Sequence, residues 1–410
     1  MTSLVVSLVL AALAVKEGGT VPTTSQRPCV QLEIPVSIDT TATKWLQLKV
    51  DSNIDVVDWV TDLTTWTSPN ITERMIGNVT VQDIFKINGQ LCVPPKGAKS
   101  EILQLATHGV GFDKRYWDVE VKPDEYSYLE AALTRGYAVF TYDRLGTGGS
   151  DKPDAYDVVQ ASVQVEVLRQ LTSLARSGNL VSSGGGSKAL SSIPPHLASY
   201  KPSKIVHVGH SFGSAITLGL IGSVDDRDYD DEAPPLSDGV VATGFLHTTL
   251  PDLEDVNVAA WGLELAREHD PVRFGDRGSG YVVQSTKSHL QLGYLGEKGA
   301  FEEGLLDYAW AVLRQPASVS EFISIGTAFG RGAAGFKGPL QFLIGEKDYE
   351  YCTGDCRGAY DVDSLKENYY PGAAALEVYL QPGTNHALTL SKNVTAGYDV
   401  TFDFLHRVGL

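Results

Sequence analysis

The run Gly209-His210-Ser211-Phe212-Gly213 is the part of this sequence whose residue types and spacing most directly suggest chemistry. It matches the pattern G-x-S-x-G, in which the serine stands on a sharp turn between a strand and a helix. The pattern alone is weak, because glycine makes up 41 of the 410 residues and chance matches arise easily. Here an apolar run at 204–208 leads into the turn and a helix-like run at 214–221 leaves it. This placement predicts that Ser211 is a nucleophile.

A serine hydroxyl becomes a good nucleophile only when a base takes its proton. In enzymes with this turn, the base is a histidine that follows the serine and the acid along the chain. Of the nine histidines, only His386 and His406 lie beyond residue 337. His386 falls in a turn-like loop after the apolar run at 376–380, whereas His406 falls in an expected C-terminal helix. We therefore predict that His386 is the base.

The histidine needs a carboxylate that holds its ring in the correct orientation. The apolar run at 339–344 is followed by Gly345-Glu346-Lys347-Asp348. We predict that Asp348 is this acid, with Glu346 as the nearest alternative, although either could be a solvated loop carboxylate. Ser211, Asp348 and His386 would then form a catalytic triad in the expected chain order.

The oxyanion that forms during acyl transfer needs two backbone N–H donors. One is expected from Phe212, the residue after the nucleophile. The other is expected from the loop after the apolar run at 101–106, which reads Thr107-His108-Gly109-Val110-Gly111. Val110 is the predicted donor in that loop, and Gly109 would let the chain approach the reacting group closely.

Short apolar runs alternate with helical segments through most of the chain, as in a parallel sheet covered by helices on both faces. The runs span 101–106, 137–142, 204–208, 239–246, 339–344 and 376–380, with crossover helices expected at 125–135 and 158–176. Two alternating segments at 30–38 and 79–91 are expected as an antiparallel lead-in, the second interrupted by a turn at Asn88-Gly89. The Ser-, Gly- and Pro-rich segment 177–203 is expected to be a surface loop.

Between 247 and 337 the strand pattern stops, and helices such as 258–268 and 301–314 are expected instead. A helical insertion at this point would cap the carboxyl ends of the strands, where ligands bind in open sheets of this type. The predicted organisation is a core at 28–247, a helical cap at 248–337 and a second part of the core at 338–410.

Together these motifs resemble the α/β-hydrolase superfamily, specifically its lid-bearing branch with a single His-Gly oxyanion motif. The resemblance covers residues 80–410 and rests on His108-Gly109, the segment 142–150, the serine turn, the segment 345–348 and His386. It implies a mostly parallel sheet flanked by helices, a helical cap, and a serine hydrolase that cleaves a carboxylic ester, lactone or related acyl bond without a cofactor. The segment 143–150 resembles a recurrent structural loop of the family and is assigned no catalytic role.

The residue at position 211 separates this chain from some members of the superfamily. Epoxide hydrolases and haloalkane dehalogenases carry Asp where this sequence has Ser211, and some lipases have a Gly-Gly-Gly oxyanion motif that it lacks. An aminopeptidase-like amidase, an acyltransferase or a cofactor-free perhydrolase remain alternatives on the same fold. A catalytically inactive binding protein is an alternative of another class.

The net charge limits the classes of partner that this protein can bind, and its first residues indicate the compartment. Acidic residues exceed basic ones by 50 to 33, and the net charge of −17 disfavours nucleic acid and anionic membranes. Residues 1–17 are predicted to be a signal peptide, with an apolar run at 4–15 that is too short to span a bilayer. That leader lacks Lys or Arg before its apolar run, so a buried or frayed terminal helix is the alternative. We expect a small acyl substrate, no nucleic acid and no stable membrane anchor.

Cysteines and glycosylation sequons agree with a secreted protein, which loosely resembles fungal extracellular members of the family. Asn70, Asn78 and Asn393 each begin a sequon. The four cysteines allow three pairings, of which we favour Cys29–Cys92 and Cys352–Cys356, with four reduced thiols as the alternative. No metal site is expected, because no second close Cys or His pair accompanies the last two cysteines.

Overall fold

The structure is a computed structural model that describes residues 29–94, 100–184, 195–223, 235–245, 247, 261–330 and 332–410. The predicted signal peptide at 1–17 lies outside these residues. None of the described helices is both long enough and apolar enough to cross a membrane.

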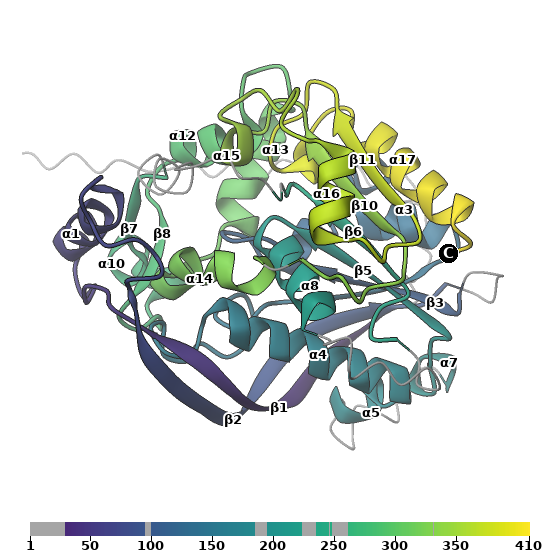
Figure 1. Ribbon diagram of the computed structural model, residues 1–410, viewed down its shortest axis with the longest axis horizontal. Coiled ribbons are helices and arrows are strands. Elements are labelled where there is room, and N and C mark those ends of the chain that lie inside the picture. Colours follow the sequence, from purple (N-terminus) through teal and green to yellow (C-terminus); the bar gives the residue numbers. More distant parts are fainter. Residues whose placement is uncertain are drawn as a thin grey trace, which may run out of the picture.

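A single large sheet forms the centre of the described chain (Figure 1). Its eight strands follow the order β1-β2-β4-β3-β5-β6-β10-β11. The pairs β1–β2 and β2–β4 are antiparallel, and the other neighbours are parallel. The strands are β1 Cys29–Trp45, β2 Met75–Cys92, β3 Ile102–Thr107, β4 Ala138–Tyr142, β5 Lys204–His210, β6 Gly239–Thr243, β10 Leu340–Gly345 and β11 Leu376–Gln381. The predicted fold class, a mostly parallel sheet flanked by helices, is confirmed.

Helices cover both faces of this sheet. From β3 the chain crosses to β4 toward one edge of the sheet, and from β5 it crosses to β6 toward the other edge. Because crossovers between parallel strands are right-handed, the helices α3 and α8 in these two connections lie on opposite faces of the sheet. α4 and α14 pack against α8, whereas α17 packs against α2 and α3. The helices of the core are α1 Asn53–Thr64, α2 Pro123–Tyr126, α3 Tyr128–Thr134, α4 Ala161–Ser177, α5 Leu180–Gly184, α7 Pro195–Ala198, α8 Phe212–Gly222, α15 Tyr349–Cys352, α16 Val362–Tyr369 and α17 Val394–Arg407.

Local sequence explains where the expected helices differ from the observed ones. The helix predicted at 125–135 is divided into α2 and α3, because Ser127 adopts an extended backbone and its hydroxyl accepts from the Glu130 amide as an N-cap. The segment predicted as a loop at 177–203 contains the short helices α5 and α7, and 185–194 lie outside the described residues.

The lead-in hairpin is longer than predicted and has no turn at Asn88-Gly89. β2 runs through both residues, and Gly89 lies between Leu32 of β1 and Tyr142 of β4 in the sheet. A side chain at this glycine would place its Cβ 2.6 Å from the ring of Phe140, so close packing explains the glycine. The Cys29–Cys92 disulfide joins directly opposed residues at the end of the hairpin and confirms that predicted pair.

The described residues between β6 and β10 form several helices, but they also form a small sheet that the sequence pattern did not predict. β7 Leu263–Leu265, β8 Tyr281–Gln284 and β9 Ala317–Ser318 form this three-stranded antiparallel sheet. The predicted helix at 258–268 is therefore wrong where β7 pairs with β8. The described α-helices here are α10 Ala266–His269, α11 Pro271–Phe274, α12 Lys287–Leu290, α13 Glu303–Tyr308 and α14 Val319–Phe329.

The small sheet is tied to the N-terminal part of the chain. Val56 and Trp59 of α1 pack in one apolar cluster with Leu265, Val282 and Val319. In Figure 1, β1 and β2 reach out from the large sheet toward α1, which lies beside β7 and β8. The long hairpin thus carries α1 to the insertion.

Candidate active site

Ser211 lies on a strained turn between β5 and α8. Its φ of 54° and ψ of −122° belong to a region that non-glycine residues rarely adopt. A Cβ at Gly209 would lie 2.5 Å from the Cα of Ser214, and one at Gly213 would lie 2.1 Å from the carbonyl oxygen of Thr107. Both flanking glycines are therefore needed for the turn to form, and such a turn is the geometry of a nucleophile elbow.

His386 and Asp348 meet because their loops follow the neighbouring parallel strands β11 and β10. His386 Nδ1 and Asp348 Oδ2 are 2.8 Å apart, and both residues are buried. A carboxylate only accepts, so the hydrogen must be on Nδ1, which leaves Nε2 free to act as a base. Asp348 also caps α15, where its Oδ1 accepts from the amide of Tyr351 at 3.0 Å.

The loop that holds His386 meets the serine turn at the ends of β5 and β6. The ring centroids of His386 and His210 are 4.9 Å apart, and His210 immediately precedes Ser211. The Ser211 amide donates to the carbonyl of Thr243 at 2.9 Å. A Cβ at the next residue, Gly244, would lie 3.2 Å from the carbonyl oxygen of His386. Backbone contacts thus place the serine turn beside the His386–Asp348 pair.

The two alternative residues lie elsewhere. His406 is exposed near the end of α17. Glu346 accepts a hydrogen bond from the Gly383 amide at 3.0 Å, so it fastens the loop between β11 and His386. The geometry therefore favours Asp348 over Glu346 as the partner of His386.

The loop after β3 lies against Ser211, because a Cβ at Gly109 would be 2.9 Å from the Cβ of Ser211. The carbonyl of Gly109 accepts from His108 Nδ1 at 2.8 Å and from Arg144 at 3.2 Å. In a trans peptide the next N–H points opposite to the carbonyl, so the Val110 amide points away from His108 and Arg144. Phe212 is the first residue of α8, and its amide has no acceptor within the helix. These are the two amides predicted to bind an oxyanion.

Arg144 and Glu321 form a buried ion pair that sequence reasoning missed. Their side chains are 0% and 1% exposed. The guanidinium also lies over the ring of Phe212 at 4.8 Å, so Arg144 contacts both segments that are predicted to bind the oxyanion. Glu321 belongs to α14 and forms a capping box with Ser318. The motif Ser-x-x-Glu at 318–321 was the sequence signal for the helix start, but nothing in it identified the arginine as the partner.

The pKa values of two imidazoles close to the site, His386 and His210, are shifted in opposite directions. Burial alone lowers the pKa of His386, but the charge and hydrogen bond of Asp348 and the charge of Glu350 outweigh it, so the pKa is raised above 6.5. Burial and the proximity of His386 lower the pKa of His210 well below its ordinary value. His210 therefore stays neutral at physiological pH.

Glu350 is a second carboxyl group close to the His386–Asp348 pair, and sequence reasoning missed it. Its Oε1 accepts from the indole nitrogen of Trp261 at 2.7 Å, which links the loop after β10 to the insertion. Burial raises the pKa of Glu350 to about 8, against the opposing effects of His386 and the Trp261 hydrogen bond. The sequence shows that Glu350 lies two residues after Asp348, but it does not show in which direction the Glu350 side chain points.

The pH profile of kcat/KM should reflect these interactions. A base must be neutral, so activity is expected to rise with pH through a midpoint above 6.5. Glu350, with its pKa of about 8, is ionised only in the upper part of this rise, and there its charge favours the imidazolium. Glu350→Gln removes that charge, so the midpoint should move to lower pH by a small amount. Glu346→Gln, which alters a carboxyl group bonded to Gly383, is the matched control and should leave the midpoint in place. A shift to higher pH in Glu350→Gln would contradict this assignment.

The Cys352–Cys356 disulfide confirms the second predicted pair and closes the loop beside Asp348. Within this loop, the Asp348 carbonyl accepts from the amides of Cys352 at 3.2 Å and Gly354 at 3.0 Å. The disulfide therefore stabilises the backbone that positions the acid.

The two disulfides should respond differently to removal. Cys352→Ser is expected to lower kcat more than the melting temperature, because the small loop contributes only about 2 kcal/mol to stability. Cys29→Ser should do the reverse, because its loop is worth about 4 kcal/mol in the same chain-entropy model. Steady-state kinetics and thermal unfolding of both variants test this, and equal effects on both readouts would contradict it.

A sequence model described as the Alpha/beta hydrolase family matches residues 105–396, more than half of the chain. The chain belongs to this family. As an alpha/beta hydrolase, it is an enzyme of the hydrolase class. No curated protein sequence matches it.

Solved structures similar to this alpha/beta hydrolase come from proteins with different activities. One is a bromoperoxidase from Bacillus anthracis, at 18% identity and a TM-score of 0.47, over 79% of this chain and 96% of that one. Another is an epoxide hydrolase from Vigna radiata, at 14% identity and a TM-score of 0.48, over 79% and 95%. A third is an esterase from Exiguobacterium antarcticum, at 14% identity and a TM-score of 0.47, over 78% and 96%.

Proposed function

We propose that this protein is a serine hydrolase that cleaves a carboxylic ester, lactone or related acyl bond. The observation that carries the proposal is the buried His386–Asp348 hydrogen bond beside the strained turn of Ser211. A nucleophile, a base with its second nitrogen free, and an orienting carboxylate are the parts that acyl transfer requires.

In the proposed mechanism, Ser211 Oγ attacks the substrate carbonyl carbon while His386 Nε2 takes the hydroxyl proton. Asp348 holds the ring and stabilises the imidazolium that forms. The amides of Val110 and Phe212 donate to the oxyanion. The imidazolium then gives its proton to the leaving alkoxide, and an acyl-enzyme remains. Water, deprotonated by His386, releases the acid and restores Ser211.

The proposal also covers the division of the chain into a core and a cap around the site. We propose that 28–247 and 338–410 form the core that holds the triad, and that 248–337 forms a cap over it. Trp261 supports this arrangement, because it donates to Glu350 next to the triad acid. The cap would then select the substrate, as in the lid-bearing branch that the sequence resembles.

Secretion is a further part of the proposal. Two disulfides support an oxidising compartment. Asn70 and Asn78 are exposed and open to glycosylation. Asn393 is less suited, because its amide nitrogen donates to the Pro382 carbonyl at 2.6 Å and its oxygen accepts from Thr384 at 2.7 Å. A glycan replaces one hydrogen on this amide nitrogen, so attachment there would disturb the hydrogen bond to Pro382.

A substrate panel tests the proposed reaction. Incubation with a fluorophosphonate probe should label one serine, and p-nitrophenyl esters or lactones should be hydrolysed, with the ester chain length giving the preference. Cleavage of aminoacyl anilides with no ester or lactone turnover would indicate the amidase alternative instead. Absence of both labelling and turnover would indicate the inactive binding protein and overturn the proposal.

A further inference from the structure

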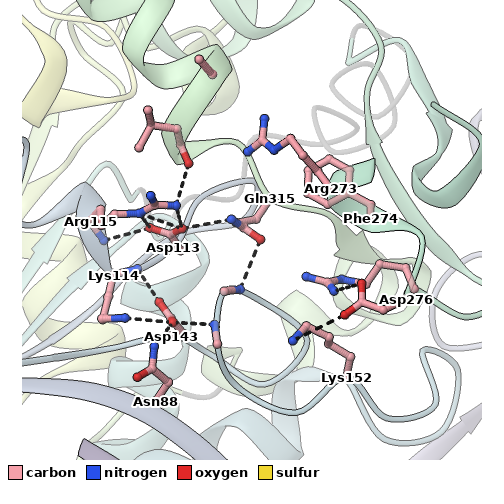
Figure 2. A pocket seen from close by; sticks show the side chains of 15 residues that line it. Asn88, Asp113, Lys114, Arg115, Asp143, Lys152, Arg273, Phe274, Asp276 and Gln315 are labelled. Atoms are coloured by element: carbon pink, nitrogen blue, oxygen red, sulfur yellow. Dashed lines mark hydrogen bonds and ion pairs between the residues drawn. The ribbon is translucent and has the colours of Figure 1, made fainter. Parts of the chain in front are cut away.

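An open pocket of about 550 Å³ lies where two loops of the core face two segments of the insertion (Figure 2). The core contributes residues from 113–115 and 148–152, and the insertion contributes residues from 273–277 and 311–315. We call it the junction pocket. Ser211, Asp348 and His386 do not line it, so it is separate from the proposed catalytic residues.

The junction pocket carries more positive than negative side chains. Its cationic residues are Lys114, Arg115, Lys152, Arg273 and Arg277. Its carboxylates are Asp113, Asp143 and Asp276. The lining therefore holds a formal excess of two positive charges, although the whole chain has a net charge of −17. A concave, positively charged site on an acidic protein concentrates anions locally.

The charged residues at 113–115 and Asp143 contribute little to this excess, because they pair with one another. Lys114 lies 3.1 Å from Asp143, and Arg115 lies 2.5 Å from Asp113. Both carboxylates are buried, and Asp113 also accepts from the side chain of Gln315 at 3.0 Å. Figure 2 shows these pairs as a hydrogen-bonded row along one side of the pocket.

On the other side lie three cations, Lys152, Arg273 and Arg277, and only one carboxylate, which two of them share. Asp276 lies 2.5 Å from Arg277 and 3.8 Å from Lys152, and its side chain is 59% exposed. Arg273 donates to two backbone carbonyls and has no carboxylate within ion-pair distance among the described residues. Arg277 is 4% exposed, and its Nε has no acceptor within the described part of the chain.

Partial burial disfavours the charged form of these three side chains unless an anion lies close to them. It lowers the pKa of Lys152, Arg273 and Arg277, because low-dielectric surroundings disfavour the charged form. The attraction of an anion bound between them would compensate for the hydration that these cations lose on burial. Guanidinium groups suit this role, since their planar donors match carboxylate and phosphate oxygens.

We propose that the junction pocket binds a small polyvalent oxyanion, held chiefly by Lys152, Arg273 and Arg277. The ligand would connect the core, through Lys152, to the insertion, through the two arginines. This site goes beyond the proposed hydrolase function and does not depend on it, because none of its residues takes part in the acyl-transfer mechanism.

Isothermal titration calorimetry of the whole protein with citrate and, separately, with pyrophosphate tests the proposal, with sodium chloride at matched ionic strength as the blank. At least one of the two should bind, and the tighter one shows whether carboxylate or phosphate oxygens are preferred. Lys152→Met should weaken binding about tenfold, as expected for loss of one charge-assisted contact. Asp276→Asn should strengthen it, because it removes the competing carboxylate.

The paired variants make the result decisive even if one of them is unstable. Lys287→Met removes a lysine that pairs with Asp307 outside the pocket, so affinity should not change. Opposite shifts in Lys152→Met and Asp276→Asn, with Lys287→Met unchanged, support the site. No heat beyond the chloride blank with either anion, or equal affinities in all the variants, overturns it.

Discussion

Ser211→Ala is expected to abolish labelling by a fluorophosphonate and to lower kcat by about 10⁴-fold or more. In the proposed mechanism the hydroxyl oxygen of Ser211 forms the acyl-enzyme, and no other side chain on the turn between β5 and α8 can replace it. The substitution removes one oxygen from a turn whose shape depends on the flanking glycines, so the fold should be kept. Labelling followed by mass spectrometry and steady-state kinetics on the best ester measure both effects.

Ser214→Ala is the matched control for this experiment. Ser214 lies on the first turn of α8 and donates to the carbonyl of Thr243 at 2.9 Å, so its loss affects packing but not the nucleophile. This variant should still be labelled. Asp348→Asn should also be severely impaired, because an amide would favour the wrong tautomer of His386. Near-normal turnover in Ser211→Ala would refute the triad.

Arg144→Met is expected to have the second-largest effect, on stability and on turnover together. It leaves the Glu321 carboxylate buried without its partner, which costs about 3–5 kcal/mol in the free energy of unfolding. It also removes one of the two donors that orient the Gly109 carbonyl, and with it the opposite-facing amide of Val110. Turnover should therefore fall by roughly 10- to 100-fold. Urea unfolding and kcat measure the two losses separately.

The double variant Arg144→Met/Glu321→Leu separates these roles. Removing both charges leaves no unpaired ion in the core, so stability should recover much of the loss. The Gly109 carbonyl still lacks its second donor, so turnover should stay low. If the double variant were as unstable as Arg144→Met, or if its turnover returned to the wild-type level, the ion pair would not have the role assigned to it.

The parallel strands of the sheet were predictable from sequence because they are short, mostly apolar and separated by helices. All residues of β4 are buried, so the strand is visible in the sequence as a mostly apolar run. Such a run is typical of a strand that is covered on both faces of a parallel sheet. The disulfide pairs were also predictable, since Cys29 and Cys92 begin and end the lead-in hairpin. The candidate site residues follow from chain order and from a motif placed between a strand and a helix.

Other features depend on contacts that local pattern does not encode. β7 has only three residues and exists because Leu265 pairs with Val282 in the insertion. Glu350 and Arg144 acquire their significance from burial beside groups that are distant in sequence. A buried ion pair such as Arg144–Glu321, separated by 177 residues, leaves no periodic signal that could be read in advance.

The Cys29–Cys92 disulfide has a consequence for proteolysis of the long hairpin. Everything between β1 and β2, including α1, lies inside the covalent loop that this bond closes. A protease that cut the exposed stretch around Trp66 would sever the chain but release no fragment, because both new ends would remain attached through the bond. A clipped molecule would therefore run intact on a non-reducing gel and separate into two pieces only after reduction.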